Sequence, residues 1–345
     1  ATMIPTRPLG TTGLRMTELS FGAAPLGELF TRLEEAEAQA VLKAAWDGGM
    51  RYFDTAPFYG HGKSEHRVGT FLRQQPREDF VISTKIGRLL VPTPDLATFD
   101  PGPWSGALLF DIVFDYSYEG IMRSWEDSLQ RLGLNRIDLL VIHDLDTMFH
   151  TPEEVENHTR QLVVGGGIRA LEELRESGRI AGFGVGVNYR ETIHRVLAFV
   201  RPDFFLIAMP YTLLDQDVLD DEFPRCAELG ISLVIGAVFA SGILITGPTL
   251  DSKYGYESAP PEILEKTRRM VEICEKHGVR LSAAALQFLL AHPLVAAIIP
   301  GALAPEHVQH HLEQCEAVIP SAFWSDLKAR GLLHPGAPVP VDESA

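Results

Sequence analysis

Four side chains that can transfer protons or bind a carbonyl oxygen lie at or just beyond the ends of predicted strands. Asp54 closes the segment RYFDT, Lys85 ends FVISTK and His143 ends DLLVIH, while Tyr59 follows Asp54 by five residues. A single ionisable group at a strand end is more often a solvated residue or a salt-bridge partner than a catalytic one. Three such strand ends with a tyrosine beside one of them favour a catalytic site.

These residue types suit one kind of chemistry when they are grouped. The phenol of a tyrosine has an ordinary pKa of about 10, and an ammonium held against its hydroxyl lowers that pKa. A buried lysine needs a carboxylate partner, which Asp54 supplies to Lys85. His143 can donate a hydrogen bond to a carbonyl or alkoxide oxygen. The set predicts a proton shuttle with no activated nucleophile, so it implies a hydride carrier as second substrate.

Short apolar runs alternate with helical patterns over most of the chain. Alternation of strands and helices predicts a parallel sheet covered by helices, and eight repeats predict a closed (β/α)8 barrel, the TIM-barrel fold. The runs are continuously apolar, as expected for strands buried on both faces. The predicted strands are 19–22, 51–55, 80–85, 138–143, 182–187, 204–208, 232–238 and 296–301.

Helical spacing between these strands is clearest in 34–49, 120–134 and 167–179, where Gly178 is placed as a C-terminal stop. We expect one barrel domain over 3–333 and a flexible C-terminal tail over 334–345.

Two segments are too long for a minimal barrel. Residues 86–118 follow the third strand and residues 239–260 follow the seventh. Long connections in a compact domain are usually functional loops or disorder, and the first holds too many aromatic residues for disorder. Within it, Trp104 and Phe110 could form a substrate platform, with Asp100, Asp111 and Asp115 as polar partners, although either aromatic could equally pack the loop onto the barrel.

Three other motifs are only partly similar to known binding sites. Gly62-Lys63-Ser64 is similar to the end of a phosphate-binding P-loop, but Pro57 occupies the first glycine position. The run GFGVGV lacks the third glycine of a dinucleotide fingerprint and lies inside a strand. His307, His310 and His311 have no evident acidic or thiolate fourth ligand, so we expect no metal.

The composition limits the classes of binding partner that we expect. The formal charge is −16, which disfavours nucleic acid and anionic membranes. The three cysteines are far apart and form no CxxC, which predicts reduced thiols in a cytoplasmic protein. A small-molecule substrate is therefore expected, and the oligomeric state is left open.

The segments FDTAPFYG, STK, VIHD and GVGVN, in this order, resemble the aldo-keto reductases over nearly the whole chain. The resemblance implies a catalytic tetrad at Asp54, Tyr59, Lys85 and His143. It also implies that Asn188 binds the nicotinamide carboxamide, although Val187 stands where a serine is usual. Further cofactor contacts implied by the resemblance fall on Gly22, Asp54, Phe239, Gly242, Leu244, Gly301 and His307.

The resemblance implies NAD as cofactor, with NADP as the weaker alternative. Relatives that use NADP bind its 2′-phosphate with a lysine and an arginine after the last strand. Gly301 and His307 stand at those positions, and neither carries a permanent charge at neutral pH. Glu306 and the overall negative charge add repulsion toward the extra phosphate.

Within the family, the aromatic loop is most similar to bacterial members that oxidise aldoses or pyridoxal. We expect oxidation of an aldose of the L-fucose or D-threo type at C1 to the lactone, with Tyr59 as general acid/base and Tyr59, His143, Trp104 and Phe110 contacting the substrate. Pyridoxal is the alternative substrate, since it also forms a hemiacetal. A nucleotide-sensing regulatory subunit is the alternative from another class, although such a subunit would not need the complete tetrad.

Overall fold

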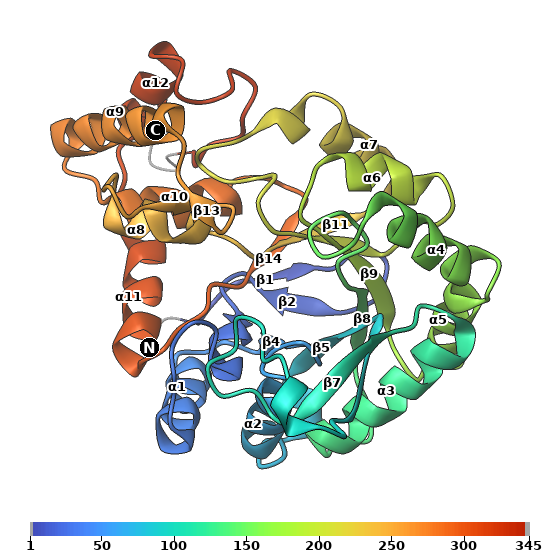
Figure 1. Cartoon of the computed structure of the whole chain (residues 1–345). Helices are drawn as coiled ribbons and strands as arrows, with labels where there is room; N and C mark the ends of the chain where they lie inside the picture. The colour runs from blue at the N-terminus through green and yellow to red at the C-terminus, as the bar shows by residue number, and fades with distance from the viewer. Residues whose placement is uncertain (1–2, 342–345) are drawn as a thin grey trace.

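The computed structural model, which describes residues 3–341, contains an eight-stranded parallel sheet (Figure 1). Its edge strands β14 and β3 are joined by a parallel bridge between Leu19 and Ile298 and by a hydrogen bond from Ser20 N to Ile298 O, so the sheet closes into the predicted barrel. All eight predicted strands are confirmed. In spatial order they are β14 (Val295–Ile298), β11 (Ser232–Ile235), β10 (Phe204–Ile207), β9 (Gly182–Val187), β8 (Leu139–Ile142), β5 (Val81–Ile86), β4 (Tyr52–Asp54) and β3 (Phe21–Gly22).

Helices surround the barrel, as Figure 1 shows. The three helices expected from spacing are confirmed as α1, α3 and α5, and Gly178 has a left-handed φ of 76° just beyond the end of α5. Within residues 3–341, no helix is long and apolar enough to cross a membrane. The longer helices are α1 (Glu35–Asp47), α2 (Lys63–Leu72), α3 (Tyr118–Leu132), α4 (Pro152–Val163), α5 (Gly167–Glu176), α6 (Glu191–Leu197), α7 (Glu222–Leu229), α9 (Pro261–His277), α10 (Leu281–Leu290), α11 (Pro305–Glu316) and α12 (Ser321–Ala329).

The barrel interior is a packed apolar core. Leu139, Val141 and Val234 point into it from the parallel strands. An antiparallel hairpin of β1 (Thr6–Pro8) and β2 (Arg15–Thr17) precedes the barrel and contributes the buried side chains of Leu9 and Met16 to the same cluster. The interior is therefore filled, which leaves the strand ends as the place for a site.

The two long connections contain structure that their sequences did not predict. Residues 86–118 include an antiparallel hairpin of β6 (Arg88–Pro92) and β7 (Phe110–Phe114), and α3 then begins with Ser117 as its N-cap. Residues 239–260 contain the short helix α8 (Ile243–Thr246) and a small hairpin of β12 (Lys253–Tyr254) and β13 (Glu257–Ser258).

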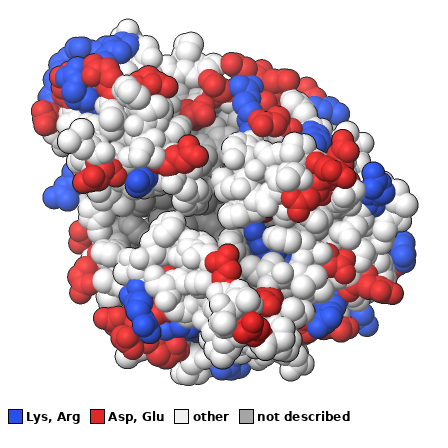
Figure 2. Space-filling model, viewed as in Figure 1, with Lys and Arg blue, Asp and Glu red and all other residues white. Residues whose placement is uncertain are grey.

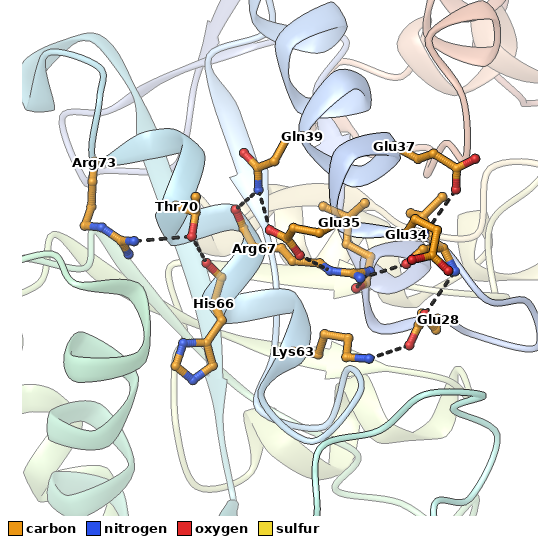
Figure 3. Close-up of polar contacts among 12 residues, drawn as sticks. Glu28, Glu34, Glu35, Glu37, Gln39, Lys63, His66, Arg67, Thr70 and Arg73 are labelled. Carbon is orange, nitrogen blue, oxygen red and sulfur yellow. Dashed lines mark hydrogen bonds and ion pairs between the residues drawn. The ribbon is translucent and has the colours of Figure 1, made fainter.

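The Gly62-Lys63-Ser64 motif has a structural role. Lys63 forms a 2.6 Å ion pair with the buried Glu28, from the connection that precedes α1 (Figure 3). Ser64 donates to Ala23 O at 2.8 Å and shares a hydrogen bond with Thr55. Both polar side chains of the motif are therefore engaged in fastening α2 to neighbouring loops.

The first residues of segment 334–345, for which the sequence predicted a flexible tail, make specific contacts with the rest of the chain. His334 N donates to Gln216 Oε1 at 3.0 Å, and the His334 ring is hydrogen-bonded to Asp220 at 2.6 Å. Ala337 is buried in the main core. The apolar contacts of this segment were not apparent in a stretch rich in proline and glycine, and residues 342–345 lie outside the described part.

Candidate active site

Asp54 and Lys85 form a buried ion pair across adjacent strands. Asp54 pairs in register with Ser83, and Lys85 is two residues further along β5 and therefore on the same face. Lys85 Nζ lies 2.7 Å from Asp54 Oδ2 and donates to Thr55 O at 2.9 Å. Ser83 Oγ donates to Asp54 Oδ1 at 2.6 Å. Both charged groups are thus bonded to the barrel, as the sequence predicted for the pair.

Tyr59 lies over this ion pair on the turn that follows β4. Its backbone N–H donates to Ala56 O, and its side chain is half-buried. Lys85 Nζ lies 4.8 Å from the centre of the Tyr59 ring. The His143 ring lies 6.0 Å from that of Tyr59 at an angle of 87°. The structure therefore brings together all the residues of the predicted tetrad.

The expected depression of the Tyr59 pKa by Lys85 is wrong for this arrangement. Burial raises the pKa of Tyr59 well above its ordinary value, and the negative charge of Asp54 adds to the rise. The reason is that the ammonium of Lys85 is already paired with Asp54, which cancels most of the field it would exert on a phenolate. Tyr59 is consequently a protonated phenol in the site as it stands.

His143 is held in its neutral form at the end of β8. Burial lowers the pKa of His143 well below its ordinary value. The backbone carbonyl of His143 accepts a 2.6 Å hydrogen bond from the hydroxyl of Tyr116. A neutral imidazole retains one N–H group, so it can donate a hydrogen bond to a substrate oxygen.

A second buried ion pair, which sequence reasoning missed, lies beside His143. Arg88 Nη1 donates to Asp144 Oδ2 at 2.7 Å and lies 3.1 Å from His143 Nδ1. Arg88 is 1% exposed, and its guanidinium carbon lies 4.0 Å from the centre of the Phe58 ring. Burial opposes ionisation of Asp144, but the charge interactions with His143 and then Arg88, with hydrogen bonds from Asn188 and Arg88, lower its pKa to about 2.

Asn188 is oriented by two carboxylates. Its Nδ2 atom donates to Asp144 Oδ1 at 2.9 Å and to Asp146 Oδ2 at 3.0 Å. Because both neighbours are acceptors, the amide nitrogen must face them and the amide oxygen points elsewhere. That oxygen is free among residues 3–341 to accept from the amide of a nicotinamide carboxamide, so the residue fits the cofactor that the sequence implied.

The aromatic residues of the 86–118 loop differ in position. Trp104 is buried, and its ring centre lies 5.6 Å from that of Tyr59 and 5.2 Å from that of Phe58. Phe110 is 38% exposed on β7, where its backbone oxygen is bonded to the ring of His61. Trp104 therefore belongs to the site, whereas no aromatic contact within residues 3–341 brings Phe110 to Tyr59.

The carboxylates expected to bind substrate hydroxyls have partners within the loop. Asp100 accepts from Gly102 N at 2.9 Å, and Asp111 accepts from Thr93 at 3.0 Å. Asp115 accepts from both the backbone and the hydroxyl of Ser117. One oxygen of each carboxylate therefore stabilises the loop or the start of α3.

The remaining predicted cofactor residues lie around the barrel seam and α8. An added Cβ on Gly22 would lie 2.4 Å from Ile299 O, so glycine permits the close approach of β3 and β14. Phe239 packs 5.5 Å from His311, Gly242 has a left-handed φ of 99°, and Leu244 is buried with its N–H bonded to Phe239 O.

The segment after β14 has no lysine or arginine for a 2′-phosphate. Gly301 faces Pro25, whose ring carbon would lie 2.6 Å from an added Cβ. His307 is exposed, and its Nδ1 accepts from Leu303 N at 3.2 Å. A larger residue at 301 would require Pro25 to move.

The face of the molecule shown in Figure 2 is hollowed between the α8–α11 region and the loops below it, with a mostly uncharged edge.

The model of the Aldo/keto reductase family matches residues 18–330. The chain belongs to this family. Aldo-keto reductases are oxidoreductases that use nicotinamide cofactors.

Named relatives extend this family assignment. The chain is 45% identical to a pyridoxal 4-dehydrogenase from Microbacterium luteolum over 337 residues, covering 95% of this chain and 97% of that protein. It is 37% identical to a D-threo-aldose 1-dehydrogenase from a Pseudomonas species, covering 93% and 96%. An aldo-keto reductase from Bacillus halodurans in its holo form superposes with a TM-score of 0.73 at 26% identity, covering 99% and 98%.

Proposed function

We propose that this chain oxidises a cyclic hemiacetal to a lactone with NAD as hydride acceptor. The observation that carries the proposal is the convergence of Tyr59, the Lys85–Asp54 ion pair and neutral His143 beneath an aromatic wall. A hemiacetal carbon bears a ring oxygen, which stabilises the positive character that develops as hydride leaves. Both pyridoxal and aldoses form such hemiacetals.

The reaction balances without a further reactant. The C–H hydride of the hemiacetal carbon goes to the nicotinamide, and the hydroxyl proton goes to the phenolate oxygen of Tyr59, which leaves the lactone carbonyl. An oxidised nicotinamide held at Asn188 would supply the hydride acceptor and a positive charge. A cation near the phenol favours its ionisation, which would offset the burial that raises the Tyr59 pKa. Lys85, paired with Asp54, lies beside the Tyr59 ring that takes part in proton transfer, and His143 orients the substrate oxygen.

Pyridoxal is the first substrate to test, ahead of the aldose that the sequence favoured. Phe58, Trp104 and Phe149 form an aromatic wall that is suited to a flat aromatic ring. The ring centre of Phe58 lies 5.2 Å from that of Trp104 and 5.4 Å from that of Phe149. Each carboxylate expected to bind sugar hydroxyls has one oxygen bonded within the loop segment. The pyridoxal-oxidising relative is also the more similar of the two, at 45% against 37% identity.

An aldose remains the second candidate. The resemblance to the D-threo-aldose 1-dehydrogenase covers 93% of the chain, and an aromatic face also suits the C–H face of a sugar. The chemistry at Tyr59 is the same for both substrates, so only the pocket wall decides between them.

The test is the rate of NADH formation by the full chain with pyridoxal, L-fucose, D-arabinose and a simple primary alcohol. We expect turnover with pyridoxal or an aldose, a higher kcat/KM for pyridoxal, and almost none with the alcohol, which cannot form a lactone. A kcat/KM for an aldose far above that for pyridoxal would reverse the substrate order. Tight NAD binding without turnover of any hemiacetal would instead favour a nucleotide-sensing subunit.

A further inference from the structure

The guanidinium of Arg88 contacts the His143 ring at its Nδ1 atom. Its Nη1 atom lies 3.1 Å from His143 Nδ1 and donates to Asp144 Oδ2 at 2.7 Å. Arg88 begins β6 directly after Gly87, whose left-handed φ of 116° turns the chain at this point. The role inferred for Arg88 rests on the proposed function, because His143 orients the substrate oxygen there.

A guanidinium has only donor groups, and this fixes the hydrogen-bonding role of the imidazole nitrogen that faces it. His143 Nδ1 must present its lone pair to Arg88, so the single proton of the neutral ring is placed on Nε2. Either the opposite tautomer or the doubly protonated ring would direct an N–H group at a cation. Nε2 lies 3.4 Å from Asp144 Oδ2, too far for a strong hydrogen bond, which leaves its proton available to a substrate oxygen.

The charges around His143 act in the same sense. Burial and the positive charges nearby disfavour the imidazolium, and Asp144 alone opposes them. Asp144 cannot dominate, because Arg88 Nη1 neutralises the same carboxylate oxygen at 2.7 Å. The titratable and charged groups that face the His143 ring are Asp144, Arg88, Lys85, His150 and Tyr59.

Arg88 is itself held rigidly enough for this task. Among residues 3–341, its Nε and Nη2 atoms are buried and have no hydrogen-bond partner. Aromatic rings take their place, because the guanidinium carbon lies 4.0 Å from the ring centre of Phe58 and 5.1 Å from those of Phe114 and Phe149. Cation–π contacts of this kind favour a desolvated guanidinium.

We propose that Arg88 is a positioning residue for the reaction, which holds His143 as the neutral tautomer protonated at Nε2. The same guanidinium carries Asp144, whose other oxygen accepts from Asn188. One cation thus orients the donor on the substrate side and supports the amide expected to bind the nicotinamide carboxamide.

The proposal is tested on the full chain by ¹H–¹⁵N long-range NMR of the histidine rings, which distinguishes the two tautomers and the protonated form. The signal of His143 is identified by its absence in His143→Gln. We expect the wild type to show the Nε2–H tautomer from about pH 6 to about pH 8, where an ordinary histidine would titrate. In Arg88→Met, we expect a mixture of tautomers and protonation at higher pH, because a cation is lost and Asp144 is left unpaired.

Two further variants serve as controls for Arg88→Met. Arg88→Lys keeps a donor cation and should retain most of the Nε2–H form. Arg77→Met removes a 2.7 Å ion pair with Asp138, which precedes the start of β8, and should leave the His143 signals unchanged. In parallel, kcat/KM should fall roughly tenfold in Arg88→Met, by analogy with the loss of an outer hydrogen bond to a metal-binding histidine.

A wild-type His143 that is protonated on Nδ1 would overturn the proposal, whether or not Arg88→Met folds. Unchanged His143 signals in a folded Arg88→Met would overturn it equally. The NMR measurement needs no substrate, so its outcome is separate from that of the proposed function. An enzyme inactive on every hemiacetal would refute the function while leaving the tautomer assignment to stand.

Discussion

The two buried ion pairs of the site, Lys85–Asp54 and Arg88–Asp144, have the same 2.7 Å separation but different surroundings. Lys85 and Asp54 have further hydrogen bonds to Thr55 and Ser83, so the pair is closed on the barrel wall. Asp144, by contrast, accepts from Arg88 with one oxygen and from Asn188 with the other. We call Lys85–Asp54 the closed pair and Arg88–Asp144 the open pair.

This contrast assigns the pairs to different parts of the reaction. The closed pair places a compensated cation beside Tyr59, where we propose that it supports proton transfer. The open pair joins His143, which faces the substrate, to Asn188, which we expect to face the cofactor. Damage to the first should therefore lower kcat, and damage to the second should weaken binding as well.

The largest effect is expected on the proton-transfer side. Tyr59→Phe removes the group that accepts the hydroxyl proton, and kcat should fall at least about 100-fold, as general acid-base catalysis requires. Within residues 3–341 no hydrogen bond to the Tyr59 hydroxyl is present, so the fold should be retained. Calorimetric titration should give a Kd for NAD close to that of the wild type. Near-normal turnover would contradict the assignment of Tyr59.

The free energy of unfolding should depend on pH through Asp144 of the open pair. The folded-state pKa of Asp144 is depressed to about 2 from an ordinary 3.8, so its stabilisation is present above about pH 4 and is lost as the pH falls toward 2. A depression of this size corresponds to about 2 kcal/mol.

Asp144→Asn removes this titration and also breaks a buried pair, which typically costs about 3–5 kcal/mol near neutral pH. Chemical denaturation should therefore show a gap between wild type and variant that narrows from pH 4 to pH 2. A gap that is constant with pH would show that Asp144 does not titrate with a depressed pKa.

Cofactor choice should be independent of both pairs, because it is decided at the other end of the cofactor. Gly301 and His307 leave the 2′-phosphate without two permanent cations, and each charge-assisted contact is worth about 1.5–3 kcal/mol. The kcat/KM with NAD should exceed that with NADP by at least about tenfold at pH 8. Equal values with the two cofactors would rule out this preference.

The smallest effect is expected at the aromatic wall beside Tyr59. Trp104→Phe keeps a ring beside Tyr59 and removes a buried indole N–H that has no partner among residues 3–341. The KM for pyridoxal should rise a few-fold, since an aromatic contact is worth about 0.5–1.5 kcal/mol. Phe110→Ala is the matched control on the exposed hairpin and should change KM little. Equal increases in KM for the two variants would indicate that Phe110 also contacts the substrate.

The sequence predicted the closed pair but not the open one, for a physical reason. Asp54, Lys85 and His143 end buried parallel strands, and such ends meet at one edge of a barrel whatever the loops do. Arg88 lies beyond a strand end, and its contact with His143 depends on the left-handed turn at Gly87. A charged residue two positions beyond the end of each of the adjacent strands β5 and β8 was the available signal.

The loops were harder to predict because their contacts are made across the chain. The β6–β7 hairpin forms within a segment rich in proline and glycine, and Trp104 is fixed by a bridge to Leu29. The carboxylates of the loop resembled hydroxyl-binding groups in sequence, yet local turns use them. Composition indicated an ordered loop without indicating which side chains face the site.

The division between the two ion pairs is tested most directly by making the same isosteric change in each and measuring kcat and the Kd for NAD. Asp54→Asn should lower kcat at least tenfold, in the range of lost acid-base assistance, with the Kd for NAD changed by less than about threefold. Asp144→Asn should raise the Kd for NAD about fivefold or more, because Asn188 loses a charged acceptor. An unchanged Kd for NAD in Asp144→Asn, or the same pattern in both variants, would contradict the account.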